Sequence, residues 1–313
     1  MSSAEIRPQN YSHAFSPYLE PIAKVRPGEK VLFRTDDAFG SLIRSESDLP
    51  GKVLVGKNVN PVTGPVFVEG AEPDDTLSVY IQSIEPARDF AVSCFISYFG
   101  GLTSTQATRT LQEPIPERTW IWPLTMGAGT EGKYLENKDI RVRVPWKPFM
   151  GCIGVAPPFE AIASTTAGPW GGNMDCPEVR PLSTVHLPVY KEGALFSVGD
   201  CHANQGQGEL CGVALEIPSE VTLVFEVIKN KKIAWPRIIS DEAIMVVGSA
   251  RPMEDAARIA YTELTLWMEE EYGFTRWEAY ELLTQVGGLC VGNMVDPTYS
   301  LVASISKQYL KRS

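Results

Sequence analysis

An acid, an imidazole and a second acid lie close together in one glycine-rich stretch of this sequence, residues 199–209. The apolar run at residues 194–198 is typical of a strand, and a strand that continues past Gly199 places alternate side chains on one face. Asp200 and His202 then point the same way. A carboxylate oxygen and a neutral imidazole nitrogen suit zinc or a similar divalent ion, which polarises a carbonyl and acidifies water. The stretch therefore predicts a metal site, whereas the simpler interpretation is a strand end whose Asp and His hydrogen-bond a turn.

Glu209 is the predicted general base of this site. It is not spaced to share a strand face with His202, but Gly206 and Gly208 permit a reversal of the chain that returns Glu209 to the metal. The alternative is a surface carboxylate that opens the next strand. Cys201 offers a second alternative, a nucleophilic thiol, because a nearby imidazole activates a thiolate. On an extended strand, however, Cys201 points away from both of its neighbours.

Two other segments are candidates for the remaining ligands, because a tetrahedral metal needs three or four protein ligands. Asn173 and Asp175 alternate just after a glycine-rich turn at residues 171–172, although a turn-capping Asp is the alternative there. Asp36 and Asp37 end a predicted strand. One of them should face inward, and spacing does not decide which; two adjacent acids can also simply be solvated.

Short strands separated by turns predict a mainly β fold with α+β additions. With 26 Gly and 24 Pro, the chain favours a β-sandwich or jelly-roll-like core over a βαβ alternation, and a Rossmann fold is disfavoured. Segments that alternate apolar and polar residues are predicted strands. They span residues 29–34, 76–84, 140–144, 183–189, 193–198, 212–217 and 220–228.

A helical pair is predicted near the C-terminus. Pro252 suits the first turn of a helix that Gly273 ends, and Thr275 with Glu278 forms a capping box for a second helix. The apolar stripe of the first helix consists of Ala256, Ala260, Leu264 and Trp267. The pair should cover one face of the sheet. We expect a single domain over residues 1–313, with at most a soft boundary near residues 88–123, where the pattern is least regular.

The charge and composition restrict the partners of the protein. A net charge of −10 and a pI near 5.0 argue against nucleic acid, since phosphate binding needs clustered Lys and Arg, so a small molecule is the expected partner. No run reaches the roughly 18 apolar residues that a membrane span needs, and the first residues lack a signal-like pattern, which predicts a cytoplasmic protein. Six cysteines without a Cys-x-x-Cys pair are expected to be reduced and mostly buried.

The motifs collectively resemble those of the acetamidase/formamidase family. The resemblance covers roughly residues 25–300 and rests on residues 199–209 (GDCHANQGQGE) and 211–216 (CGVALE), with further segments in the order of the family: 60–71 (NPVTGPVFVEGA), 151–157 (GCIGVAP), 171–175 (GGNMD), 187–189 (LPV) and 193–196 (GALF). It implies a β-sandwich core with α+β additions, a divalent metal that is most often zinc, and hydrolysis of small amides to carboxylate and ammonia. Some members act on a cyclic lactam.

The resemblance also implies roles for individual residues. Asp200 and His202 match the acid and imidazole pair of the family, Asp175 its Gly-Gly-Asn-x-Asp acid, Asp37 its early Asp-Ala acid, and Glu209 its Gly-x-Gly-Glu acid. The first four are the expected metal ligands and Glu209 is the expected catalytic base.

The sequence departs from the family at two positions near these residues. Cys201 and Gln207 replace a usual Gly and a usual Asp, and the lost carboxylate favours one metal over two. Metal and a side-chain amide of Asn173 or Gln205 are expected to stabilise the oxyanion. Asn60 and Trp170 are further candidates for substrate contact. We also expect a homo-oligomer. Two alternative functions are a thiol amidase in which Cys201 is the nucleophile and a non-catalytic jelly roll that binds a small ligand.

Overall fold

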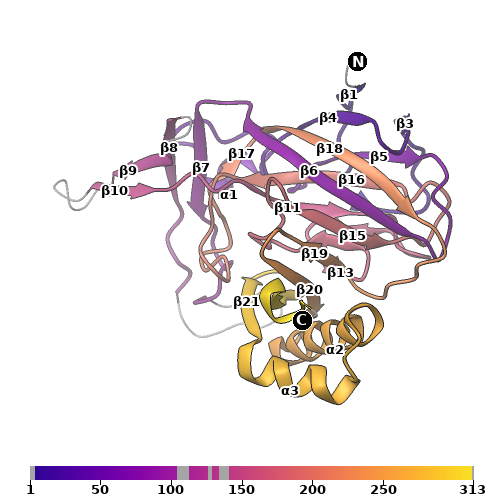
Figure 1. The fold of residues 1–313 in the computed structure, drawn as a ribbon. Helices are drawn as coiled ribbons and strands as arrows, with labels where there is room; N and C mark the ends of the chain where they lie inside the picture. Colours follow the sequence, from indigo (N-terminus) through magenta and orange to yellow (C-terminus); the bar gives the residue numbers. More distant parts are fainter. Residues whose placement is uncertain (1–3, 104–112, 126–128, 134–140, 312–313) are drawn as a thin grey trace.

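Two large β-sheets packed face to face form most of the molecule in this computed structural model, which describes residues 4–103, 113–125, 129–133 and 141–311 (Figure 1). The first sheet has nine strands in the order β1 (Ala4–Ile6), β4 (Lys30–Thr35), β18 (Ser219–Ile228), β6 (Thr76–Pro86), β15 (Thr184–Pro188), β19 (Arg237–Ile239), β20 (Ala243–Ala250), β22 (Tyr299–Ser306) and β21 (Gly288–Asn293).

The second sheet contains eleven strands and carries most of the functional residues discussed below. Its main path is β10 (Arg141–Val144), β9 (Gly129–Lys133), β8 (Arg118–Thr125), β7 (Phe90–Phe95), β17 (Glu216–Ile217), β16 (Phe196–His202), β11 (Phe149–Gly154), β14 (Gly171–Asn173) and β13 (Ala167–Gly168). Off this path, β5 (Val62–Val68) pairs with β16 and β3 (Ala23–Val25). A small separate sheet joins β2 (Ala14–Phe15) to β12 (Ile162–Ala163), and a short helix, α1, spans Pro50–Val53.

The hydrophobic core lies between the two large sheets. Phe33 of β4 and Phe225 of β18 come from the first sheet, and Phe196 of β16 comes from the second. Their rings meet edge to face, with centroids 5.8 Å apart for Phe33 and Phe196 and 5.0 Å apart for Phe196 and Phe225. The contact shows that the sheets form a sandwich, as the alternation of apolar and polar residues predicted.

Two predicted strands begin later than their sequence pattern suggests. The residues before Phe196 form a turn in which Gly193, Ala194 and Leu195 all have positive φ, so β16 begins at Phe196 and runs through to His202. The strand predicted at residues 212–217 is only β17, because Gly212 also has positive φ. In both places turn geometry overrides the apolar pattern.

The predicted helical pair is confirmed. Helix α2 (Met253–Tyr272) packs its buried stripe against β20 and β22, and Gly273 ends it in the left-handed conformation with φ 77°. Helix α3 (Arg276–Val286) begins with the predicted capping box of Thr275 and Glu278. Pro252 is the N-cap residue rather than a first-turn residue. A short 3₁₀ helix, η1 (Lys307–Tyr309), follows β22.

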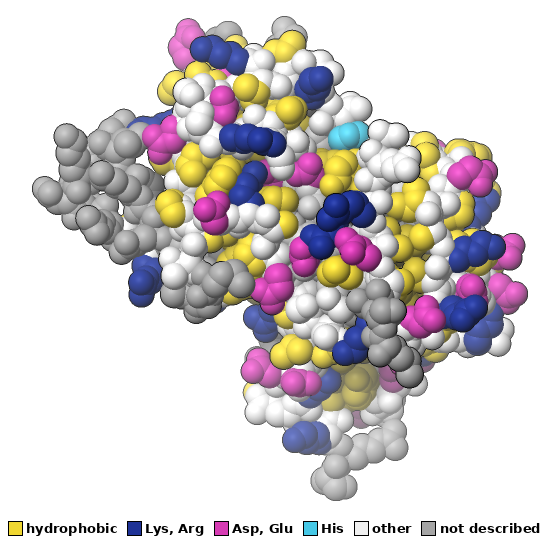
Figure 2. Space-filling view, turned by 90° about the horizontal axis from the view of Figure 1, so that it is seen from above, with side chains coloured by type: hydrophobic (Ala, Val, Ile, Leu, Met, Phe, Trp, Pro, Cys, Tyr) yellow, Lys and Arg dark blue, Asp and Glu magenta, His cyan; other side chains and the backbone are white. Residues whose placement is uncertain are grey.

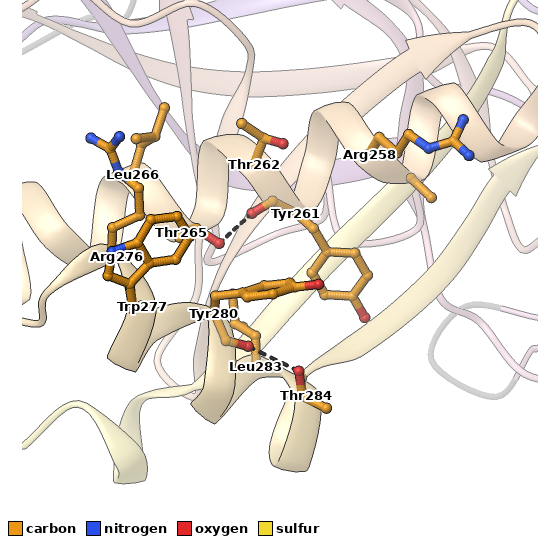
Figure 3. Close-up of a pocket in the computed structure, with 12 residues that line it drawn as sticks. Arg258, Tyr261, Thr262, Thr265, Leu266, Arg276, Trp277, Tyr280, Leu283 and Thr284 are labelled. Atoms are coloured by element: carbon orange, nitrogen blue, oxygen red, sulfur yellow. Dashed lines mark hydrogen bonds between the residues drawn. The ribbon is translucent and has the colours of Figure 1, made fainter.

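A groove of about 820 Å³ separates parts of α2 and α3. Tyr261 of α2 and Tyr280 of α3 project into it from the two helices (Figure 3). The side chains of Trp277 and Tyr280 are 75% and 64% exposed, so this groove is an apolar surface that faces solvent.

The irregular region at residues 88–123 does not stand apart from the sandwich where the structure describes it. Strands β7 and β8 lie in it and pair with each other, and β7 pairs with β17 of the second sheet. Residues 104–112 of this region lie outside the described residues. On the face seen in Figure 2, basic and acidic side chains are interspersed. Within the described ranges, no helix has the length and apolarity needed to cross a membrane.

His186 of β15 makes the protein sensitive to acid. Burial and the nearby Arg237 guanidinium lower the pKa of His186 to about 4 from its ordinary value of 6.5. Between pH 6.5 and pH 4, His186 is protonated in the unfolded chain but stays neutral in the folded protein. The free energy of unfolding therefore decreases as pH decreases through this range, by about 3 kcal/mol in total. Urea unfolding should show a smaller loss between pH 7 and pH 4.5 in His186→Gln than in the parent. An equal loss in both proteins would contradict the prediction.

Candidate metal and catalytic site

Five acids and one imidazole converge at one buried place in the second sheet and its loops. Among the described residues, three groups of three side chains could each hold a metal ion. Within each group, the potential ligand atoms lie within 4.8 Å of one another. The groups are Asp175, Asp200 and His202; His202, Glu209 and Glu216; and Asp175, Glu209 and Asp296. We call these six residues the acid cluster. All six side chains are buried, with exposures of 7% or less.

Strand β16 brings Asp200 and His202 to the same side, as predicted. The Nε2 atom of His202 lies 3.5 Å from Asp200 Oδ1 and 3.4 Å from Glu216 Oε2. Glu216 reaches this position because β17 pairs with β16 in a register that sets it opposite His202. One imidazole nitrogen is therefore shared between two carboxylates from neighbouring strands.

Gly151 of β11 makes room for the carboxylates. Its neighbours in β11 pair with residues on both sides of Asp200, so Gly151 faces Asp200 across the two strands. A Cβ atom at position 151 would lie 2.5 Å from Asp175 Oδ1 and 2.6 Å from Asp200 Oδ2. Any residue other than glycine would displace one of the two carboxylates.

Side-chain amides hold the acids in place. Asn60 donates from Nδ2 to Asp200 Oδ2 at 3.0 Å and to Asn173 Oδ1 at 3.1 Å. Asn173 in turn donates to Asp296 Oδ2 at 2.7 Å. Asn293, at the end of β21, donates to Asp175 Oδ2 at 3.1 Å. Asp175, Asp200 and Asp296 thus come from separate segments of the chain and are tied together by asparagines.

Four residues of this region have backbone conformations that are uncommon for anything but glycine. Asn60, Asp175, Asp200 and Glu209 have φ values between 48° and 52°. Such conformations persist only where the surrounding structure determines them, and they gather at functional sites. The left-handed backbone at Glu209, directly after Gly208 with φ 84°, produces the predicted chain reversal that returns the carboxylate to His202.

Burial and crowding shift the protonation of the cluster. Burial, reinforced by neighbouring acids, raises the pKa of Asp175 well above its ordinary value, and burial raises that of Glu209 in the same direction against the opposing effect of His202. Burial raises the pKa of Glu216 to about 7 and that of Asp296 to about 6. Burial alone would lower the pKa of His202, but the charges of Glu216 and Asp200 outweigh it and raise that pKa well above 6.5. Five acids crowded around one imidazole repel one another unless protons or a bound cation compensate their charge.

The donor atoms of the cluster fit a divalent metal. Asp175 Oδ1, Asp200 Oδ1, Glu216 Oε2 and both ring nitrogens of His202 are buried without a hydrogen-bond partner. Buried polar atoms are normally paired, because an unsatisfied one costs free energy. Carboxylate oxygens and an imidazole nitrogen are ligands that zinc prefers. The residues present therefore fit the metal that the sequence predicted.

Asp37 is the one predicted ligand that lies outside the acid cluster. Its carboxylate lies 2.9 Å from Arg88 and accepts hydrogen bonds from the backbone of Phe39 and Ser41. Asp36 instead bonds the backbone of Asp37 and the Ser41 hydroxyl. A carboxylate that is paired with a guanidinium and two amides has little capacity left for a cation. Asp37 lies in the loop beside the cluster and belongs to none of the groups of potential ligand atoms among the described residues, and its role as a metal ligand stays a prediction.

The residues predicted to contact substrate have other partners. The amide group of Asn60 donates hydrogen bonds to Asn173 and Asp200. Gln205 likewise donates to the carbonyl oxygens of Asp175 and Gly292. These amides are therefore not free to bind an oxyanion in this arrangement. Asn173 bonds Asp296 and Asn60, so these amides position the acid cluster. Asn60 and Asn173 also line the smaller of the cavities beside the cluster, and their contact with substrate stays a prediction.

Trp170 does not line either cavity beside the acid cluster. Its ring lies against Gly168, where an added Cβ would come within 2.4 Å of ring carbons. It also packs on the small apolar cluster of Phe15, Val62 and Cys152. The glycine-rich turn thus accommodates the indole rather than exposing it to a substrate.

Cys201 faces the core between the sheets, opposite to His202. Its thiol contacts Thr35 at 3.6 Å, and burial raises its pKa to about 11. This arrangement disfavours the thiol amidase alternative. All six cysteines are free thiols, and Cys94, Cys152, Cys176 and Cys201 are buried, as expected for reduced cysteines.

Two cavities adjoin the acid cluster. The smaller has about 70 Å³ and is lined by Asp200, Glu209, Glu216 and Asp296 together with Phe99 and other residues. The larger has about 470 Å³ and also borders Glu209. A cavity of the smaller size holds only a molecule of a few heavy atoms.

Comparison with known proteins agrees with the arrangement of these residues. The family model described as Acetamidase/Formamidase family matches residues 2–168 and 159–296. The chain belongs to the acetamidase/formamidase family. This assignment confirms the resemblance that the sequence motifs indicated.

Solved structures of acetamidases have the same fold as this family member. An acetamidase from Yersinia enterocolitica is 39% identical, with a TM-score of 0.91 over 97% of this chain and 91% of that one. An acetamidase from Bacillus halodurans is 31% identical, with a TM-score of 0.87 over 97% and 98%. A formamidase from Methylophilus methylotrophus is 25% identical over 68% of this chain. The chain spans less than two thirds of the length of the curated relatives it matches, 64% and 63%.

Glu216 and Asp296 were missed in the sequence. Glu216 is an acid inside an apolar run, residues 213–217, and a lone carboxylate in a buried strand is a usable signal. Asp296 lies 80 residues beyond Glu216, the nearest other member, in the loop between β21 and β22, and carries no comparable signal. Its place depends on the hydrogen bond from Asn173.

Proposed function

We propose that the protein hydrolyses a primary amide to a carboxylate and ammonia with the help of one divalent metal, most plausibly zinc. The observation that carries the proposal is the set of unpaired ligand atoms on Asp175, Asp200, Glu216 and His202, gathered beside a 70 Å³ cavity. Membership of the acetamidase/formamidase family supports the same reaction. A bound zinc ion would polarise the amide carbonyl and bring the pKa of a bound water towards neutrality.

Asp175, Asp200 and His202 are the proposed metal ligands, with Glu216 as the fourth. Asp175, Asp200 and His202 form one group of potential ligand atoms, and Glu216 belongs to a second group that shares His202. Asp296 forms a further group of potential ligand atoms with Asp175 and Glu209. It is held by Asn173, so its proposed role is to keep these acids in position.

Glu209 is the proposed general base and general acid. Its carboxylate is buried and lines the small cavity, where it can remove a proton from an attacking water. The same carboxyl group then delivers the proton to the departing nitrogen, so that ammonia leaves as a neutral molecule. Burial raises the pKa of Glu209, which makes its carboxylate a stronger base towards the attacking water.

Exclusion of water supports the reaction in this cavity. The acid cluster lies inside the sandwich, where electrostatic interactions with a polarised carbonyl are stronger than in water. A cytoplasmic location and a homo-oligomer stay predictions.

Ammonia release tests the proposed function. Protein whose metal content has been measured should release ammonia from acetamide, lose that activity after chelation, and regain it with one equivalent of zinc per chain. Treatment with iodoacetamide should leave the rate unchanged because Cys201 is buried. Metal binding without turnover of any amide would instead support the non-catalytic alternative.

A further inference from the structure

An apolar chamber adjoins the small acid-lined cavity. Its volume is about 470 Å³, within the range of small-molecule sites, whereas the acid-lined cavity has about 70 Å³. The two cavities share three lining residues, Phe99, Glu209 and Val213. Glu209, the proposed base, therefore lies at the boundary between the two cavities.

The lining of the chamber is suited to hydrocarbon. Its walls include Phe95, Ile115, Trp122, Val144 and Leu215, which come from β7, β8, β10 and the loops beside them. Among the described residues that line it, Glu209 is the only charged one, and it lies at the end shared with the acid cluster.

The chamber reaches the surface. Leu102 and Leu210 line it and are 75% and 50% exposed. Formamide and acetamide fill only the acid-lined cavity and gain nothing from such walls. A longer acyl group would extend from the carbonyl past Glu209 and remove apolar surface from water.

We infer that the preferred substrates are primary amides with a large apolar acyl group, of the size of a six-carbon chain or a phenylacetyl group. This inference rests on the proposed function, because it assigns the acyl group of that same reaction. Binding energy from the remote acyl group can be used to position the carbonyl, which raises the specificity constant beyond that of a small amide. The amide nitrogen and carbonyl occupy the acid-lined cavity and the acyl group occupies the chamber.

Steady-state ammonia release by the zinc-loaded enzyme tests this inference. We expect kcat/KM for hexanamide and phenylacetamide to exceed kcat/KM for acetamide by at least about tenfold. If acetamide and formamide are hydrolysed at least as well as the larger amides, the inference is wrong and the proposed function stands. If no amide releases ammonia, both are wrong.

Filling the chamber provides an independent measurement. Ser93 lies on the same face of β7 as Phe95 and lines the chamber, so Ser93→Phe would occupy part of its volume. We expect the ratio of kcat/KM for phenylacetamide to that for acetamide to fall about tenfold. Ser93→Val, a smaller change, should reduce the ratio less and serves if the larger side chain prevents folding. Ser47→Phe, at an exposed position away from both cavities, is the matched control. An unchanged ratio in both Ser93 variants would overturn the inference.

Discussion

Glu209→Gln should reduce ammonia release by about 10³-fold while the metal content stays at the parental level. The substitution keeps the shape of the side chain but removes the group that accepts and returns the proton, and general acid–base catalysis contributes about 10²- to 10⁴-fold. Glu209 is buried beside His202 and Asp296, so its replacement leaves the other acids in place. Initial rates with acetamide and phenylacetamide, together with metal analysis of the same samples, measure both quantities.

Glu178→Gln is the matched control for this variant. Glu178 is also largely buried, and burial raises its pKa too, but it lies outside the acid cluster. Its replacement should leave the rate unchanged. Loss of the metal together with the activity in Glu209→Gln would assign Glu209 to the ligands and contradict its role as the base.

His202→Ala should abolish metal binding and, with it, activity. His202 supplies the only nitrogen ligand of the acid cluster, and its ring is fixed edge to face against Phe149 with centroids 4.8 Å apart. Without it, Asp200 and Glu216 lose the group that lies between them. We expect zinc affinity to weaken by more than about 100-fold, since even the partners behind metal ligands contribute 10- to 100-fold.

The three histidines of the chain provide an internal comparison. His186→Ala removes the other buried imidazole, which lies on β15 away from the acid cluster, and should retain zinc and activity at neutral pH. Equilibrium dialysis with zinc distinguishes the two variants. Full zinc binding by His202→Ala would remove this residue from the metal site and with it the central element of the proposed function.

The sequence alone was enough to predict the placement of those residues whose position depends on local spacing. Asp200 and His202 share a face because β16 is a strand at that point, and Glu209 returns because Gly208 permits the reversal. The helical pair was equally predictable, since caps and an apolar stripe are local signals. These features need only the conformation of a few consecutive residues.

The remaining features depend on pairing between distant segments. Glu216 reaches His202 through the register of β17 with β16, and no spacing within either strand specifies that register. Asp37 had the right type and context for a ligand, but Arg88, 51 positions along the chain, neutralises it. The asparagines were predicted as substrate contacts because the sequence does not reveal which hydrogen-bond donors are already used.

Gly151 limits how the protein can be altered. Because the space beside β11 is filled by carboxylates from elsewhere in the chain, that strand can acquire no new side chain at this position. On β7, by contrast, Ser93 faces the chamber, where a larger side chain would enter the cavity and not displace a carboxylate. Under the proposed function, evolution or design that adapts this protein to other acyl groups should therefore change the wall at β7 and leave β11 intact, so that selectivity and chemistry vary independently.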